Sequence, residues 1–189
     1  MTNTTQIRAY IESQGLKLGH VARVLGIGYP GGGPMDRLAE GGDEKKYQLP
    51  RAKVDGAPLD FSFSGLKTAA LNLIHSAEQK KEPLDLPSFA ASFSRAVADE
   101  LVPRAMEAAE QCGRTKIAAA GGVAANSKIR AELERACQIS GKQLYLPKLS
   151  LCGDNGAMIG CQAYYEYLAG RRGDWSLNGY ANRDISADV

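Results

Sequence analysis

The C-terminal part of the chain alternates between short apolar runs and helical patterns, and this order constrains the fold more than any other feature. Residues 116–120 form a short apolar run that ends in two glycines, and a helix is predicted from about residue 126 to 140. A second strand over 143–146 and a helix over 155–168 follow. Strands that alternate with helices in this way predict an α/β protein in which helices feed a sheet.

The middle of the chain, residues 64–112, is predicted to be mostly helical. A helix is expected from about residue 66 to 78, and Ser88 is interpreted as the N-cap of a long helix that reaches about residue 112. The alternating residues 60–63 suggest a short strand before the first of these helices. We therefore expect a helical part beside the α/β part.

Glycine and proline dominate residues 28–34, and together they disfavour both helix and strand. A short helix is expected only from about Met35 to Ala39. Flexible backbone followed by an acid can wrap a polar ligand, with Asp36 accepting hydrogen bonds from hydroxyl or amine groups. The alternative interpretation is an ordinary linker loop.

The turn after the first predicted strand, residues 118–126, is a candidate ligand site. Its two glycines let a ligand approach the backbone closely, and the helix that follows offers free N–H groups to an anion. Asn126 lies at the start of that helix, where its amide can bond to a sugar or a base. A tight strand-to-helix turn capped by Asn126 is the alternative, and the local pattern alone favours it.

A second candidate is the segment 151–158, which precedes the last predicted helix. Asp154 can ligate a hard or borderline cation there, or it can cap the helix, and capping is the interpretation that the local pattern favours. Cys152 beside it is either a soft metal ligand or a buried structural thiol, of which the thiol is the more common.

Charge and cysteine content exclude several classes of protein. The net charge is only +2, so the overall charge does not predict binding to nucleic acid or to an anionic membrane. No apolar run is long enough to cross a bilayer. The four cysteines form no CxxC pair, which makes reduced thiols in a cytoplasmic protein the simplest interpretation. His20 and His75 lie too far apart to form an HxxxH pair.

Four motifs, in this order, resemble the signatures of the tRNA N6-adenosine threonylcarbamoyltransferase family over roughly residues 21–170. They lie at 28–32, 61–68, 120–126 and 152–159. The resemblance implies an α/β fold, the C-terminal lobe of an actin- and Hsp70-like ATPase fold with a helical subdomain. The lobe would span 28–170, with a helical part over about 64–112, an α/β part over about 116–170 and a tail over 171–189.

The resemblance also implies an acyltransferase activity. A threonylcarbamoyl group would pass from threonylcarbamoyl-AMP to N6 of adenosine 37 in tRNAs that read ANN codons. By position in the motifs, Gly32, Asp36 and Asn126 would contact the adenylate, or ATP in its place, and Asp154 would ligate a divalent iron or zinc ion. The implied partners are a paralogous subunit and an ATPase. With so small a net charge, a local patch or another subunit would have to hold the tRNA.

The departures from the family pattern are as informative as the matches. The family's other metal ligands are two histidines in an HxxxH pair of the N-terminal lobe, and this sequence contains neither that pair nor the first phosphate-binding loop. Gly19 stands where the family usually has an aspartate. Because one carboxylate cannot hold a catalytic metal well, we expect the isolated chain to be inactive.

Residues 1–27 form a helical segment that is atypical for the family, and residues 6–27 resemble the first two helices of a Cro-like helix-turn-helix protein. A recognition helix would have to follow, but the Pro-Gly-Gly run follows instead. Two alternatives to the transferase therefore stay open. One is a non-catalytic nucleotide-binding or scaffold paralogue, and the other is a DNA-binding regulator that uses the N-terminal helices.

Overall fold

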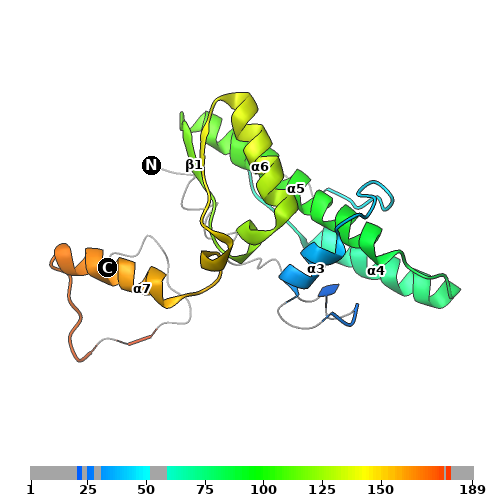
Figure 1. Cartoon of the computed structure of the whole chain (residues 1–189), viewed down its shortest axis with the longest axis horizontal. Helices are drawn as coiled ribbons and strands as arrows, with labels where there is room; N and C mark the ends of the chain where they lie inside the picture. The colour runs from blue at the N-terminus through cyan, green and yellow to red at the C-terminus, as the bar shows by residue number, and fades with distance from the viewer. Residues whose placement is uncertain (1–20, 23–24, 28–30, 52–58, 177, 180–189) are drawn as a thin grey trace.

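The computed structural model describes residues 21–22, 25–27, 31–51, 59–176 and 178–179 (Figure 1). Its elements are α3 (Gly32–Leu38), α4 (Ser64–Lys80), α5 (Leu86–Gln111), β1 (Lys116–Ala118), η1 (Gly122–Ala125), α6 (Ser127–Ser140), β2 (Gln143–Tyr145), η2 (Leu149–Leu151) and α7 (Gly156–Leu168). Helices with a small parallel sheet agree with the α/β organisation expected from the strand–helix alternation.

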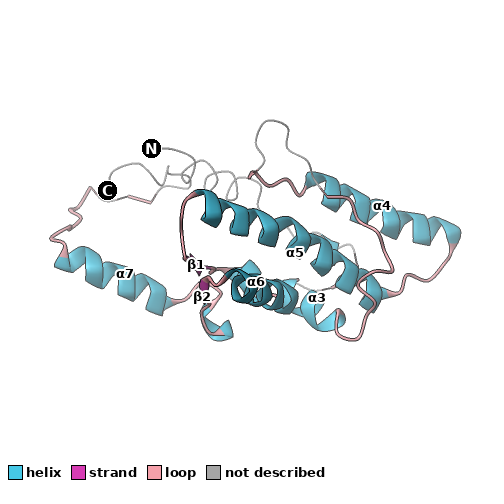
Figure 2. Ribbon diagram, turned by 90° about the horizontal axis from the view of Figure 1, so that it is seen from above, coloured by secondary structure: helices cyan, strands magenta, loops and turns pink. Residues whose placement is uncertain are grey.

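Helix α5 is the centre of the hydrophobic core (Figure 2). Its buried residues Phe89, Phe93 and Val97 recur every four positions and so lie along one face. Helices α4 and α6 add their own buried stripes to the same core, with Leu66, Ala70 and Ile74 from α4 and Ile129 and Leu133 from α6. The short helix α3 adds Met35, which is 2% exposed.

The sheet consists of β1 and β2, which pair in parallel with Ile117 opposite Leu144. Leu144 packs against the core from the inner face of the sheet. Helix α6 connects the two strands, as a parallel pair requires. Because the strands are parallel, both carboxyl ends lie at one edge, and the connections 119–126 and 146–155 leave from that edge. Ligand sites of α/β proteins commonly lie there.

Residues 60–63 do not form the predicted strand. Instead, Phe61 is buried and its ring stacks on Phe63 with centroids 6.3 Å apart, while the Arg104 guanidinium of α5 lies over Phe61 at 5.9 Å. The alternation of apolar and polar residues therefore reflects packing of a loop against α5, and in the described part of the chain no strand pairs with it.

Ser88 is not the N-cap that the sequence suggested. Helix α5 begins at Leu86, and Asp85 caps it by accepting a hydrogen bond from the Ser88 N–H. Pro87 fits in this first turn because its missing N–H would have no helical partner there. The Ser88 hydroxyl donates to Asp85 Oδ2 at 2.7 Å and accepts from the Asp43 N–H at 3.1 Å, so it joins the helix start to the preceding loop.

Helix α3 begins at Gly32, three residues earlier than predicted. Gly32, Gly33 and Pro34 occupy its first turn, where the backbone N–H groups lack helical partners in any case. The expectation that the whole Gly-Pro run avoids regular structure is therefore wrong for its last three residues.

The two predicted N-terminal helices fall outside the described residues, except for 21–22 and 25–27. Val21 and Ala22 are helical, and both are buried in the core. Residues 171–176 and 178–179 of the predicted tail contain no helix or strand, and the rest of the tail is outside the described part. Among the described helices, none has the length and apolar character needed to cross a bilayer.

Candidate functional site

The structure brings together Asp36 and Asn126, two of the predicted ligand-binding residues. The side-chain amide of Asn126 donates a hydrogen bond to Asp36 Oδ1 at 2.9 Å. Asp36 is carried by α3 and Asn126 by the connection between β1 and α6. Both side chains are half-buried, so the contact lies at an accessible surface between two elements.

Asn126 is also the N-cap of α6. Its Oδ1 accepts from the Ile129 N–H at 3.0 Å, while its Nδ2 holds Asp36. The glycine turn before it explains this position: Gly121 has φ +90° and ψ 173°, a conformation open only to glycine, and the 3-10 turn η1 then delays the helix until residue 127. The capping interpretation of Asn126 is therefore confirmed, and its amide nitrogen bonds to Asp36 at the same time.

Ser127 completes the cluster around Asp36. Its N–H donates to both oxygens of the Asp36 carboxylate at 3.1 Å, and its hydroxyl donates to Oδ1 at 2.8 Å. The carboxylate thus lies at the N-terminus of α6, the positive end of the helix dipole. Oδ1 accepts hydrogen bonds from the Asn126 amide, the Ser127 hydroxyl and the Ser127 N–H. Oδ2 accepts only from the Ser127 N–H, which it shares with Oδ1. Oδ2 therefore keeps lone-pair capacity for a donor from a ligand.

A cavity of about 350 Å³ adjoins this cluster. It lies between α3, the loop that follows it, α5 and α6, and its lining includes Asp36, Ser127, Lys128, Glu44 and Ser94. That volume is within the range of small-molecule sites in proteins. Its surface is largely apolar with a few charged and polar groups at the edge, which suits a ligand that has both an apolar face and hydroxyl groups.

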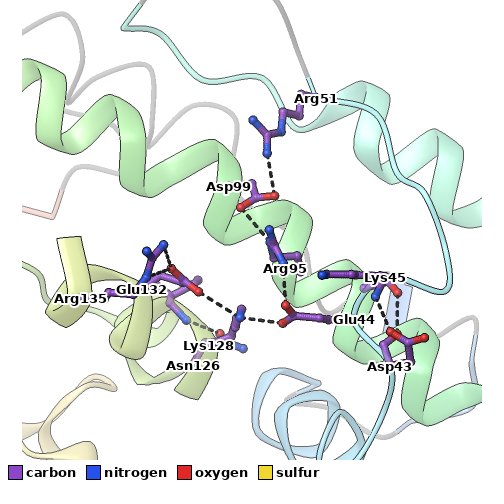
Figure 3. A network of polar contacts seen from close by, with 12 residues as sticks. Asp43, Glu44, Lys45, Arg51, Arg95, Asp99, Asn126, Lys128, Glu132 and Arg135 are labelled. Carbon is purple, nitrogen blue, oxygen red and sulfur yellow. Dashed lines mark hydrogen bonds and ion pairs between the residues drawn. The ribbon is translucent and has the colours of Figure 1, made fainter.

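Glu44 and Lys128 of the cavity lining belong to a larger ionic network, which Figure 3 shows. Lys128 pairs with Glu44 at 2.6 Å and with Glu132 at 3.0 Å, and Arg95 pairs with Glu44 from the other side at 2.6 Å. The hydrogen bond from Lys128 lowers the pKa of Glu44, against the opposing effect of burial. For Lys128, burial opposes the charge, but the hydrogen bonds to Glu44 and Glu132 raise its pKa on balance. Both groups therefore stay charged.

The network continues across α5 and fixes the loop that follows α3. Arg95 also bonds to Asp99 at 3.0 Å, and Asp99 pairs with Arg51 at 2.8 Å. Figure 3 shows the chain of contacts running from α6 through the loop to α5. These pairs are partly exposed, so each contributes little to stability, and together they join α6, the loop after α3 and α5.

Gly32 lies in the first turn of α3, close in sequence to Asp36. Apart from its chain neighbours and the backbone of its own helix, no atom of the described residues lies within 4 Å of the position that a Cβ of Gly32 would occupy. Internal packing therefore does not require glycine here, and the space beside its backbone is open to a ligand.

Asp154 lies at the same edge of the sheet but outside the Asp36 cluster. The cap of α7 is Asn155, whose Oδ1 accepts from the Met158 N–H at 3.0 Å, so capping by Asp154 is not observed. Asp154 is exposed, and its side chain makes no hydrogen bond or ion pair within the described residues. Its carboxylate is therefore available to a ligand.

Arg130 positions the connection that carries Asp154. From α6 it donates to the carbonyls of Ala124 and Pro147, both at 2.8 Å, and it contacts the Cys152 sulfur at 3.6 Å. Cys152 is 3% exposed, which agrees with a buried structural thiol. Arg130 thereby ties the connection before α7 to the turn before α6.

The described residues do not by themselves fit a resident metal ion. A protein-bound metal usually has three or four side-chain ligands. Within the described ranges, no three His, Cys, Asp or Glu side chains come together. Asp154 is one candidate ligand, and His75 is exposed on α4, in another part of the fold.

Sequence reasoning missed several residues of this region, chiefly Ser127, Glu44, Lys128 and Arg130. Ser127 follows Asn126 directly and so could have been found from the motif. Glu44 and Lys128 lie 84 residues apart in the sequence, and no local pattern predicts that they pair. In the sequence, Arg130 is an ordinary charged residue of an amphipathic helix, and nothing in the local pattern predicts its contacts.

Comparison with known proteins identifies relatives over most of the chain. Residues 7–161 match the family model described as tRNA N6-adenosine threonylcarbamoyltransferase. A protein of that name from Clostridium botulinum strain 657 is 44% identical over 162 residues, which are 86% of this chain and 48% of the relative. The corresponding Staphylococcus aureus protein, strain Newman, is 42% identical over 165 residues, or 87% of this chain and 48% of the relative.

A third relative of the same name, from Caldicellulosiruptor saccharolyticus, is 42% identical over 158 residues and is matched over 46% of its length. The chain therefore spans about half the length of the curated relatives it matches. The family match also begins at residue 7, within the N-terminal segment that was expected to be atypical for the family.

Proposed function

This chain belongs to the tRNA N6-adenosine threonylcarbamoyltransferase family, and we propose that it supplies the adenylate-holding part of that transferase. It is proposed to form the C-terminal lobe of the actin- and Hsp70-like ATPase fold over residues 28–170, with residues 171–189 as a tail. The reaction is the transfer of threonylcarbamoyl from threonylcarbamoyl-AMP to N6 of adenosine 37 in ANN-decoding tRNAs.

One observation carries this proposal: the Asp36–Asn126–Ser127 cluster adjoins a cavity of about 350 Å³. A ribose offers hydroxyl donors, and Asp36 Oδ2 has acceptor capacity for them. Gly32 leaves room for close approach to the backbone of α3. Asp36 and Ser127 line the cavity and support binding of a nucleoside monophosphate there, whereas Asn126 and Gly32 lie beside it and do not line it.

The proposed reaction requires these residues mainly to orient the adenylate. The amine N6 attacks the carbonyl carbon of the mixed anhydride, a C–N bond forms, N6 loses a proton, and AMP leaves with the electrons of the broken C–O bond. Because the anhydride is already activated, holding the adenylate in register with the tRNA base supplies much of the rate enhancement. Asp36, Asn126 and Gly32 are the residues proposed to hold it.

We further propose that Asp154 contributes one ligand to a divalent ion, iron or zinc, together with ligands from outside the described residues. An exposed carboxylate without a partner among the described residues supports this role. The proposed partners are tRNA, a paralogous subunit and an ATPase. The four free thiols, Cys112, Cys137, Cys152 and Cys161, support the cytoplasm as the location.

Calorimetry with ATP, AMP and a non-hydrolysable threonylcarbamoyl-adenylate analogue tests the proposal. The analogue is expected to bind. Asp36→Asn is expected to weaken its binding, because the amide keeps one acceptor oxygen where the carboxylate has two. Single-turnover assays with the isolated chain and ANN-decoding tRNA are expected to show no transfer, because the described residues provide only one candidate metal ligand.

The outcomes separate the alternatives. Absence of adenylate binding would favour the non-catalytic scaffold paralogue, whereas robust transfer by the isolated chain would contradict the expected inactivity. Sequence-specific binding to duplex DNA, lost on deletion of residues 1–20, would support the DNA-binding regulator.

A further inference from the structure

Helix α5 contains three buried serines, and they differ in their hydrogen bonds. Ser88 donates to Asp85, and Ser92 donates to the Asp43 carbonyl at 3.2 Å, so both join α5 to neighbouring loops. Ser94 is 5% exposed, and within the described ranges its hydroxyl makes no hydrogen bond. A buried hydroxyl that lacks a partner is unfavourable and is uncommon in folded proteins.

The Ser94 hydroxyl also lacks the bond that helical serines and threonines often make to the carbonyl four residues earlier. Ser140 in α6 donates to the Ala136 carbonyl at 2.9 Å, and Thr68 in α4 donates to the Ser64 carbonyl at 3.0 Å. In the described part of the chain, Ser94 has no such partner. Its donor and its acceptor sites are therefore both available to a bound molecule.

Ser94 lines the same cavity as Asp36, from a different helix. The other charged groups of the lining are either paired or open to solvent: Glu44 and Lys128 pair with each other at 2.6 Å, and Glu40 is exposed. Among the described residues, Ser94 thus contributes a buried polar group to this cavity whose hydrogen-bonding capacity is unused.

The surroundings of Ser94 favour a nucleobase over a phosphate. Ala91, three positions earlier on the same face of α5, and Ala131 of α6 also line the cavity and give it small apolar side chains. A base has apolar faces and an edge that carries both donors and acceptors, and a hydroxyl can bond to either. Lys128 is already bound to Glu44 and Glu132, so it offers little positive charge to a phosphate here.

We propose that Ser94 is a specificity-determining residue, which hydrogen-bonds to the edge of the base while Asp36 accepts from the ribose. This inference rests on the proposed function, since it assigns a base contact within the same adenylate site. A site that bonds to a polar group of its ligand discriminates against an analogue that lacks this group, because the buried protein group is then left without a partner.

Calorimetric titration of AMP into the parent chain and into Ser94→Ala tests the contact. We expect Ser94→Ala to bind AMP roughly three- to ten-fold more weakly, the effect of one neutral hydrogen bond. Four analogues identify the bonded group: purine riboside 5′-monophosphate lacks the amine, and the 1-deaza, 3-deaza and 7-deaza forms of AMP each lack one ring nitrogen. One of them should bind equally well to both chains, because it has already lost the group that Ser94 contacts.

Ser76→Ala is the matched control, because Ser76 is a helical serine of α4 that does not line the cavity. It should bind AMP as the parent chain does. The melting temperature of Ser94→Ala should equal or exceed that of the parent, since alanine favours a helix and the lost hydroxyl has no partner in the described residues.

Three results would overturn the inference. Unchanged AMP affinity in Ser94→Ala would exclude a contact with the nucleotide, and an equal loss for AMP and all four analogues would exclude a contact with the base. A lower melting temperature of Ser94→Ala than of Ser76→Ala would assign the hydroxyl to the fold. Failure of the parent chain itself to bind AMP would instead contradict the proposed adenylate site, and the Ser94 contact with it.

Discussion

The side-chain amide of Asn126 holds the carboxylate of Asp36 at 2.9 Å, although 90 residues separate the two in the sequence. The same Asn126 side chain caps α6 through its oxygen. Asn126 therefore both starts α6 and, together with Ser127, holds Asp36 at the cavity. This relationship links the stability of the fold to the geometry of the proposed adenylate site.

Asp85 makes the chain sensitive to acid. Hydrogen bonds from Lys46 and from the side chain and backbone of Ser88 lower the pKa of Asp85 from 3.8 to about 2. Because the unfolded state binds this proton at a higher pH than the folded state, stability is fully present above about pH 4 and falls as the pH drops towards 2.

Melting temperatures measured between pH 7 and pH 2 test this effect. Asp85→Asn should shrink the loss of stability between pH 4 and pH 2, since it removes the titrating group while keeping a capping oxygen. An unchanged slope in the variant would mean that other carboxylates cause the acid sensitivity.

Gly42 is required by close packing between the loop and α5. A Cβ at this position would lie 2.2 Å from the carbonyl oxygen of Pro87 and 2.7 Å from the Ser88 nitrogen. Both are backbone atoms, so relief demands a shift of the loop that lines the cavity. We expect Gly42→Ala to lower the free energy of unfolding by ~1–3 kcal/mol, the usual cost of overpacking.

Urea unfolding measures that cost, and Gly65→Ala is its control. Gly65 lies in α4, and among the described residues no atom outside the backbone of its own helix and its chain neighbours lies within 4 Å of its Cβ position, so alanine there should be neutral or stabilise by up to ~1 kcal/mol. Equal destabilisation by both variants would count against the packing explanation.

Arg130 is expected to control the order of the connection before α7. Arg130→Met removes the hydrogen bonds to the Ala124 and Pro147 carbonyls, each worth roughly 1.5–3 kcal/mol when the donor is charged. Hydrogen exchange should then accelerate at the Leu151 and Cys152 amides, which bond within this connection.

Arg135→Met, a change at an exposed arginine of the same helix that pairs with Glu132, should leave those amides unaffected. Protection that survives Arg130→Met would show that the connection is held by other contacts.

The helices and the α/β order could be predicted because their signals are local. The spacing of Leu66, Ala70 and Ile74 marks α4, and the glycines before Asn126 mark the turn into α6. The prediction failed where tertiary contacts decide. The residues around Phe61 look like a strand but pack as a loop, because Arg104 and Phe63 cover the ring of Phe61. Ser88 looks like a cap, but Asp85 caps the helix.

The candidate site shows the same division. The motifs predicted a ligand-binding role for Asp36 and Asn126, but only the fold shows that these two residues bond to each other. The pairing of Glu44 with Lys128 depends on the arrangement of α5 and α6 around the loop, which no sequence pattern encodes. Asp154 remains a prediction, since the described residues show its availability but no companion ligands.

Calorimetric titration of the threonylcarbamoyl-adenylate analogue into Asn126→Ala and Asn155→Ala is the decisive experiment for the proposed adenylate site. Both asparagines cap a helix by accepting an N–H at 3.0 Å, so both variants lose a similar capping contribution of ~1 kcal/mol. Only Asn126 also holds Asp36 at the cavity. We predict analogue binding that is unchanged in Asn155→Ala and roughly ten-fold or more weaker in Asn126→Ala. Equal affinity in the parent chain and both variants would contradict the proposed site.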